Sequence, residues 1–415
     1  MKMHGLIGLA ALLAGGLAQA QDVKVNVLLE AWYTQMLDSN LRLNGPAVGG
    51  YMAAPSNDSV FKENQFSIRR CEITLGGKLT DQLTWNVMFD PNLSTSQVGN
   101  NVLQDAWVNY QFTPQLSVRG GQFKPMQTWE AAVVAPSGIM FYNRSMVARL
   151  VGDRRDRGVV AVYAFGAAQG LYGKMNLGVF NGTADDGSGG KNPDSSPQKD
   201  LASRLELGYG SDHKFGAYYR VGSSEVKDNG TLVAGTTTGW GPNAPTAAEI
   251  RANNDKCSNL GAYYVYETSR WQAAVEVITG TLGRRYPTVF SSATPVKREH
   301  LDQKFLGYTF SGVYKMSHHQ LTARYDFLNY NQGNDWYTPT SPYLPTTGVN
   351  AGSDFSPKFT EAILGYNYVF NPAKFSQGKV KLNYIHRSKN ILAPRLGQTG
   401  EQGGDSLLLS LQVGY

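Results

Sequence analysis

The stretch LQDAWVNYQFTPQLSVRGGQF, residues 103–123, decides the fold. In its first half, apolar residues alternate with Asp105, Asn109 and Gln111. Alternation with a period of two is typical of a β-strand that has one apolar and one polar face. Thr113-Pro114 separates this run from a second alternating run, so the stretch predicts two antiparallel strands joined by a short turn.

The same pattern recurs along the chain and predicts sixteen strands. Every second link between them is short, and the other links are long and rich in Pro, Asn, Asp and Gly. Short periplasmic turns, long external loops and an even strand number are typical of bacterial outer-membrane barrels. We therefore expect an all-β fold, a 16-stranded antiparallel transmembrane β-barrel whose third loop folds into the lumen. The predicted strands are 23–33, 66–79, 82–91, 103–112, 115–123, 157–166, 171–180, 201–210, 213–222, 259–268, 270–280, 303–317, 319–330, 358–371, 378–388 and 404–415.

A secreted β-sandwich or β-helix would also contain alternating strands. Neither explains the regular succession of short and long links, nor the aromatic residues at strand ends. The composition favours the barrel, because 23 Tyr, 17 Phe and 7 Trp accompany only 17% charged residues. Tyr and Trp are enriched where a protein crosses the membrane–water interface.

The first twenty residues have the pattern of a signal peptide. Lys2 precedes an apolar run over residues 5–17, and Ala18-Gln19-Ala20 forms a small-x-small cleavage site. The run is shorter than the roughly 20 residues that a membrane-spanning helix needs, although an N-terminal anchor helix is the alternative. We expect a signal peptide over 1–20, a transmembrane β-barrel porin domain over 21–415, and a location in the cell outer membrane.

Nothing in the sequence indicates catalysis or a cofactor. Cys71 and Cys257 belong to no CxxC motif, and we expect two unpaired thiols rather than a disulfide. His318-His319 lies at a predicted turn, where solvation explains it without a metal. No nucleophile motif occurs, which argues against a lipase or protease. The formal charge of +6 is mild, and we expect no nucleic-acid partner.

The third long link, residues 124–156, holds most of the candidate functional residues. A barrel of this size leaves an aqueous channel, and Arg and Lys at its narrowest point favour anions. Asp153 and Asp156 stand among these cations, so a mixed ion-pair network that pins the loop is the alternative. Arg144 and Arg149 have fewer acids nearby and are predicted to face the pore. The candidate cations are Lys124, Arg144, Arg149, Arg154 and Arg155, with Arg157 just beyond.

Further cations fall on the polar faces of predicted strands and could guide anions along the wall. Glu30, Glu206 and Asp326 share those faces, so ordinary ion pairing inside the lumen is the alternative. The wall cations are Arg70, Arg119, Arg204, Arg220, Arg324, Lys381 and Arg387.

Several motifs resemble the phosphate-selective porin O and P family. The likeness is strongest over residues 66–165 and looser elsewhere. The motifs are Phe66-Ser67-Ile68-Arg69-Arg70-Cys71-Glu72-Ile73, Asp105-Ala106-Trp107-Val108, Gly121-Gln122-Phe123-Lys124-Pro125, Met140-Phe141-Tyr142-Asn143-Arg144-Ser145, Asp153-Arg154-Arg155-Asp156-Arg157-Gly158-Val159, Gly365-Tyr366-Asn367-Tyr368 and Val380-Lys381-Leu382-Asn383-Tyr384.

This resemblance implies a homotrimer of sixteen-stranded barrels, each with an anion-selective pore. Arg69, Arg70, Lys124 and Arg144 fall at matching motifs, but the sequence offers no equivalent of the family's lysine cluster. We expect a passive channel in outer-membrane lipid that prefers small anions, with phosphate as the candidate solute. The alternative is a barrel that houses a partner protein, such as an electron-transfer cytochrome.

Overall fold

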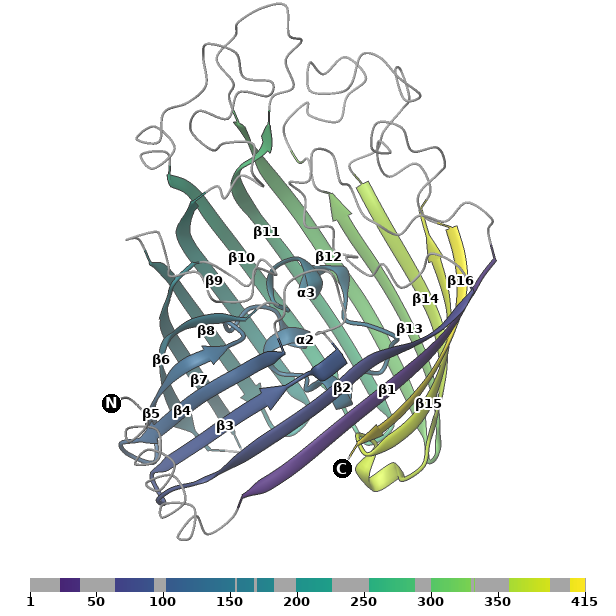
Figure 1. Ribbon diagram of the computed structural model, residues 1–415, viewed down its shortest axis with the longest axis horizontal. Helices are drawn as coiled ribbons and strands as arrows, with labels where there is room; N and C mark the ends of the chain where they lie inside the picture. Colours follow the sequence, from purple (N-terminus) through teal and green to yellow (C-terminus); the bar gives the residue numbers. More distant parts are fainter. Residues whose placement is uncertain are drawn as a thin grey trace, which may run out of the picture.

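The computed structural model describes residues 23–37, 64–92, 102–153, 155–167, 170–182, 199–225, 254–287, 300–329, 332, 358–388 and 404–414. Its sixteen antiparallel strands form one closed barrel in which each strand pairs with its sequence neighbours (Figure 1). The strands are β1 (Lys24–Met36), β2 (Gln65–Lys78), β3 (Leu83–Phe89), β4 (Leu103–Gln111), β5 (Leu116–Phe123), β6 (Asp156–Gly166), β7 (Leu171–Phe180), β8 (Asp200–Tyr209), β9 (His213–Glu225), β10 (Asn254–Glu267), β11 (Trp271–Pro287), β12 (His300–Met316), β13 (His319–Asn329), β14 (Lys358–Val369), β15 (Gly378–Arg387) and β16 (Gly404–Gly414).

The first and last strands close the barrel. β1 pairs with β16 from Leu28 opposite Gly414 to Met36 opposite Ser406. Closure leaves no strand edge exposed to lipid, where an unpaired backbone group would be costly. The predicted fold class and all sixteen strands are confirmed. The short links also lie together at one end of the barrel (Figure 1).

The main differences from the predicted boundaries concern β9 to β12. β10 begins five residues earlier than predicted, and β11 ends seven residues later. In these extensions polar residues replace the apolar alternation, yet the backbone ladder continues, with Asn254 opposite Glu225 and Cys257 opposite Leu282. Alternation therefore predicts only the part of a strand that has an apolar face, whereas ladder hydrogen bonds need no such pattern.

The two faces of the sheet differ as expected for a barrel in a membrane. On β16, Leu409, Leu411 and Val413 are about half exposed on the outer surface, whereas Ser410 and Gln412 are buried in the interior. No helix within the described ranges is long and apolar enough to cross a membrane. Cys71 is a free cysteine, and the side chain of Cys257 lies outside the described residues.

Candidate functional site in the barrel lumen

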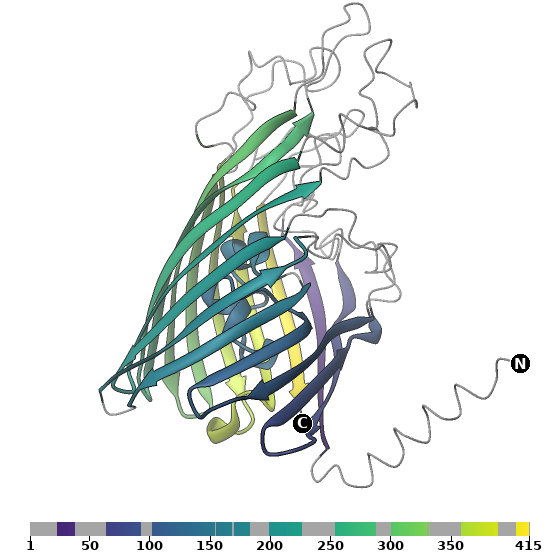
Figure 2. The ribbon, with the colours of Figure 1, turned by 90° about the vertical axis from the view of Figure 1, so that its left-hand side faces the viewer.

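The described part of the link between β5 and β6, residues 124–153 and 155, lies inside the barrel, and we call it the lumen loop. It contains the helices α2 (Trp129–Ala132) and α3 (Met146–Val151) and the 3-10 helix η3 (Pro136–Gly138). Both views show α2 and α3 surrounded by strands (Figures 1 and 2). The predicted inward fold of the third loop is confirmed.

Side-chain caps explain where the two α-helices begin. Thr128 accepts a hydrogen bond from the backbone N–H of Ala131, and Ser145 accepts one from that of Ala148. Thr128 has φ 59°, a left-handed conformation that a β-branched residue rarely adopts. Arg204 of β8 holds the Thr128 carbonyl oxygen by a 2.8 Å hydrogen bond. A Cβ at Gly152 would collide with the Thr128 hydroxyl, so this position requires glycine.

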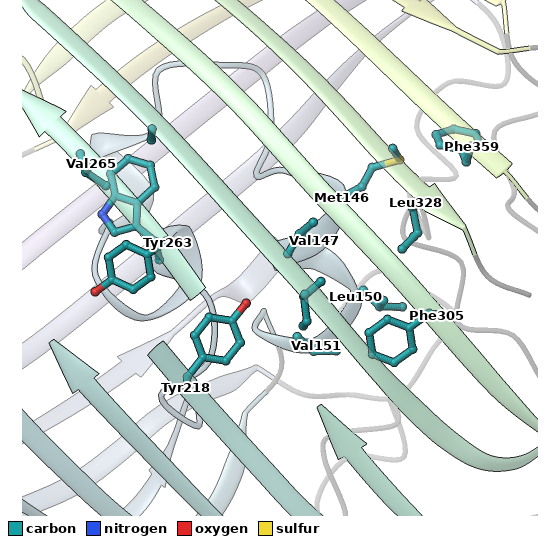
Figure 3. Close-up of a cluster of buried hydrophobic side chains, with 13 residues drawn as sticks. Met146, Val147, Leu150, Val151, Tyr218, Tyr263, Val265, Phe305, Leu328 and Phe359 are labelled. Atoms are coloured by element: carbon teal, nitrogen blue, oxygen red, sulfur yellow. The ribbon is translucent and has the colours of Figure 1, made fainter. Parts of the chain in front are cut away.

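An apolar core fixes α3 to the barrel wall. Met146, Val147, Leu150 and Val151 pack against side chains that the six strands β9–β14 direct into the lumen, and most of these side chains are labelled in Figure 3. Burial of each such side chain contributes roughly 1.5–3 kcal/mol. The sequence carried a signal for this core, since these strands have apolar residues on the inward face as well as the outward one. The inward apolar residues are Val265, Ile278, Phe305, Leu328 and Phe359.

Polar side chains of the wall satisfy the backbone of the lumen loop. Arg324 of β13 donates to the Asn143 carbonyl at 2.7 Å, and Asn367 of β14 donates to the Met140 carbonyl at 2.9 Å. Lys379 of β15 donates to the Ser137 carbonyl at 3.0 Å. Because a buried carbonyl without a partner is costly, these bonds hold the loop in one position along β13–β15.

Further bonds hold the first part of the loop on other strands. Trp129 donates its backbone N–H to Glu276 of β11 at 2.7 Å. Gln127 donates to Asn259 of β10, also at 2.7 Å. The loop thus contacts the wall from β8 to β15 through both its helices and its irregular segments.

The open part of the lumen lies along the opposite wall. The inward side chains of Asn367, Lys379 and Asn383 are fully buried beneath the loop. In contrast, the inward side chains of Trp107 and Arg119, on β4 and β5, are partly exposed. Water and solutes therefore have access to the lumen beside β2–β5.

A β-bulge places two adjacent arginines in this open part. The register between β1 and β2 shifts at Arg69, with Glu30 opposite Arg70 and Ala31 opposite Ile68. As a result, Arg69 and Arg70 both point inward, although neighbouring residues in a regular strand point to opposite faces. Arg69 lies 5.1 Å from the ring centroid of Trp32, and Arg70 pairs with Glu30 at 3.3 Å.

A second group of cations surrounds Asp153 of the lumen loop. Asp153 forms ion pairs with Lys124 and with Arg144, the latter at 3.2 Å from Nε to Oδ1. Arg70 and Arg155 are close enough to act on the same carboxylate, and Arg155 also pairs with Asp105 of β4 at 3.0 Å.

These two groups are coupled, and we call them together the basic cluster. Within the described part of the chain it has eight cations and six carboxylates, so its formal charge is positive. The cations are Arg69, Arg70, Arg119, Lys124, Arg144, Arg155, Lys379 and Lys381, and the carboxylates are Glu30, Glu72, Asp90, Asp105, Glu130 and Asp153.

Crowding of like charges affects the titration of the loop residues. Burial, followed by repulsion from Arg144, lowers the pKa of Lys124 to about 7. Burial alone would raise the pKa of Asp153, but Lys124 and Arg144 outweigh it and hold this pKa well below its usual range. Lys124 therefore changes charge near neutral pH while Asp153 stays ionised.

The structure places the other candidate cations in different surroundings. Arg149 on α3 pairs with Glu361 of β14 at 3.1 Å, in a buried group that includes Arg324 and Arg387. Arg144 is also buried. Both cations that the sequence predicted to face the pore are thus held by carboxylates.

Arg119, Arg220 and Arg157 differ in their position relative to the lumen. Arg119 stacks over Trp107 at 4.1 Å, and the described residues include no carboxylate within ion-pair distance of it. Arg220 is buried between Asp156 and Asp200, each at 2.7 Å.

Arg157 has the outward parity of Val159, because Asp156 takes the inward position on β6. Arg154 lies outside the described residues.

The family model for phosphate-selective porin O and P matches residues 48–398. The chain belongs to this family of outer-membrane porins. The resemblance found in the sequence motifs is thereby confirmed. Members of the family are channel proteins and not enzymes, so this porin is a channel protein.

Solved structures share the fold of this porin at low sequence identity. The outer membrane channel DcaP of Acinetobacter baumannii is 11% identical with a TM-score of 0.56, over 95% of this chain and 97% of that one. OprB of Pseudomonas putida is 11% identical with a TM-score of 0.54, over 98% and 97%. At this identity the likeness concerns the barrel fold alone. None of the curated proteins compared with the porin matches its sequence.

No group of three or more His, Cys, Asp or Glu residues in the described ranges could hold a metal ion. His319 contacts Tyr366, with 2.6 Å between Nδ1 and the hydroxyl oxygen. Its surroundings are therefore those of an aromatic girdle at a barrel end.

Proposed function

We propose that this porin is a passive diffusion channel that prefers anions and that phosphate is its candidate solute. The observation that carries the proposal is the basic cluster, whose partly exposed members Arg69, Arg70, Arg119 and Arg155 border the open part of the lumen beside β2–β5. An excess of fixed positive charge raises the local concentration of anions and lowers that of cations. No bond of the solute is made or broken.

The chemistry of the cluster supports an oxyanion as the solute. Arg70, Arg119 and Arg155 present planar guanidinium groups on the partly exposed side of the lumen. Such groups donate paired hydrogen bonds to phosphate or carboxylate oxygens. A solute that exchanges among several weak donors can bind and still leave, which conduction requires.

The position of the lumen loop supports a diffusion channel over a barrel that houses a partner protein. The loop contacts the wall from β8 to β15 and is anchored by its own apolar core. It therefore occupies the interior that a folded partner would need. We also propose that residues 1–20 are a signal peptide removed on export, that residues 21–415 form the barrel domain, and that three copies associate in the membrane.

The test is the reversal potential of the purified porin in a planar lipid bilayer under a potassium chloride gradient, followed by titration with phosphate. We expect a reversal potential of the sign that chloride selectivity gives. Block of the chloride current by millimolar phosphate supports phosphate as a solute. Cation selectivity, or a protein that forms no channel, contradicts the proposal.

A further inference from the structure

The open part of the lumen carries a patch of polar and aromatic side chains on three neighbouring strands, β3, β4 and β5 (Figure 1). Asn86 of β3 lies directly opposite Trp107 of β4. Asn109 of β4 lies directly opposite Thr84 on one side and Arg119 on the other. Side chains directly opposite each other on adjacent strands are about 5 Å apart. These five residues therefore form one continuous surface, which we call the Trp107 patch.

The polar side chains of this patch have unused hydrogen-bonding groups. Thr84, Asn86 and Asn109 are partly exposed, and their side chains make no hydrogen bond to any described residue. The guanidinium of Arg119 donates none within the described ranges either, and its buried Nε has no partner there. By contrast Asn367, beneath the lumen loop, donates both to a backbone carbonyl and to a side-chain amide. The groups of the patch are therefore available to a solute.

Two glycines leave space beside the indole ring of Trp107. Gly121 of β5 lies directly opposite Trp107, and Gly158 of β6 lies directly opposite Gly121. Gly121 is exposed and has φ 137°, and a Cβ added there would collide with the backbone of Trp107. The wall beside the partly exposed indole thus has no side chain over the width of two strands. This gap gives the ring of a solute room next to the indole.

The patch also has a site for one anionic group. A guanidinium such as that of Arg119 donates paired hydrogen bonds to phosphate oxygens. The nearest inward carboxylate on β4 is Asp105, which already pairs with Arg155 at 3.0 Å. Lys78 of β2 is exposed and lies directly opposite Thr84, so it adds positive charge at the same end of the lumen. An anionic group at Arg119 is therefore electrostatically favoured.

We propose that the Trp107 patch selects phosphorylated sugars, with the phosphate at Arg119 and sugar hydroxyls at Asn86 and Asn109. An amide both donates and accepts hydrogen bonds, as a hydroxyl does. The indole of Trp107 supplies apolar surface to the C–H groups of the sugar ring. Inorganic phosphate would use Arg119 and leave the amides and the indole without a contact. The inference rests on the proposed anion channel and names the class of its solute.

The test compares block of the chloride current by glucose 6-phosphate and by inorganic phosphate in planar bilayers at pH 8, where each carries about two negative charges. We expect glucose 6-phosphate to bind the wild type about fivefold more tightly, which corresponds to roughly 1 kcal/mol. Asn86→Ala and Asn109→Ala should each weaken binding of glucose 6-phosphate about threefold and leave binding of inorganic phosphate unchanged. Gln115→Ala is the matched control, since it removes an exposed amide from the turn of the β4–β5 hairpin.

Equal block by the two solutes in a chloride-selective wild type would overturn the inference and leave the proposed anion channel standing. Equal weakening of both solutes in the asparagine variants, or an equal loss of glucose 6-phosphate binding in Gln115→Ala, would also overturn it. A cation-selective reversal potential would contradict the channel proposal and the inference together. Wild-type chloride conductance verifies that each variant is correctly folded.

Discussion

Replacing Arg119 by Gln tests the electrostatic basis of the proposed anion preference. Arg119 is partly exposed on the open wall and stacks on Trp107, and no carboxylate of the described chain lies within ion-pair distance of it, although Asp105 is near enough to interact with its charge. The substitution removes one full charge from the passage and keeps a polar side chain of moderate length. Loss of the stacking interaction costs roughly 0.5–1 kcal/mol, too little to unfold the barrel.

The expected size of the effect follows from Coulomb's law. At about 6 Å from the guanidinium and an effective dielectric constant of about 60, the interaction with a monovalent ion is roughly 0.9 kcal/mol, and 0.1 M salt reduces it to about 0.5 kcal/mol. Anions lose this attraction and cations lose an equal repulsion, so the two energies differ by about 1 kcal/mol. The anion-to-cation permeability ratio should therefore fall about fivefold.

Reversal potentials of single variants in planar bilayers measure this ratio. Arg157→Gln is the matched control, because Arg157 lies on the paired strand of the same β5–β6 hairpin and shares the outward parity of Val159. It should leave the ratio nearly unchanged. An unchanged ratio in Arg119→Gln, or an equal fall in both variants, would refute the assignment of the open lumen to the β2–β5 wall.

Three further predictions concern the lumen loop. Because the pKa of Lys124 is lowered to about 7, its charge is present at pH 6 and absent at pH 8, so anion selectivity should fall over this range in wild type but not in Lys124→Met. Leu150→Ala should remove roughly 2–5 kcal/mol from the core that holds α3 and increase current fluctuations in single-channel records, whereas the outward-facing Leu205→Ala should not. Glu361→Gln removes the carboxylate that the buried Arg149, Arg324 and Arg387 share, and it should lower the free energy of unfolding in detergent by roughly 3–5 kcal/mol, measured by thermal denaturation. Glu206→Gln removes a carboxylate that is nearer to solvent and should cost less than about 1 kcal/mol.

The placement of Arg157 could have been predicted from the sequence. Val159 and Tyr163 are half exposed on the outer surface, and residue 157 has the same parity. Parity assigns residue 157 to the outward face once residue 159 is assigned to lipid. The run of arginines at 154, 155 and 157 suggested that Arg157 faces the pore, although strand parity indicates the opposite face.

The carboxylate partners of the loop arginines could not have been predicted in the same way. Arg149 meets Glu361, which lies 212 residues later in the chain, because α3 packs against the wall to which β14 belongs. Local counts of acidic residues carry no information on such a contact. The bulge at Arg69 is a similar case, since it depends on how β2 pairs with β1 and not on the order of residues within β2.

The sequence by itself determined the strand number, the direction of each strand and the location of the long loop between β5 and β6. These properties depend on residue periodicity and turn composition, which are local and repeat along the chain. Only the tertiary structure decided which cations border the open lumen and which are held by carboxylates. Closure of the barrel and the path of the loop bring together charges that are distant in sequence, and the energy of a charge depends on its neighbours in space.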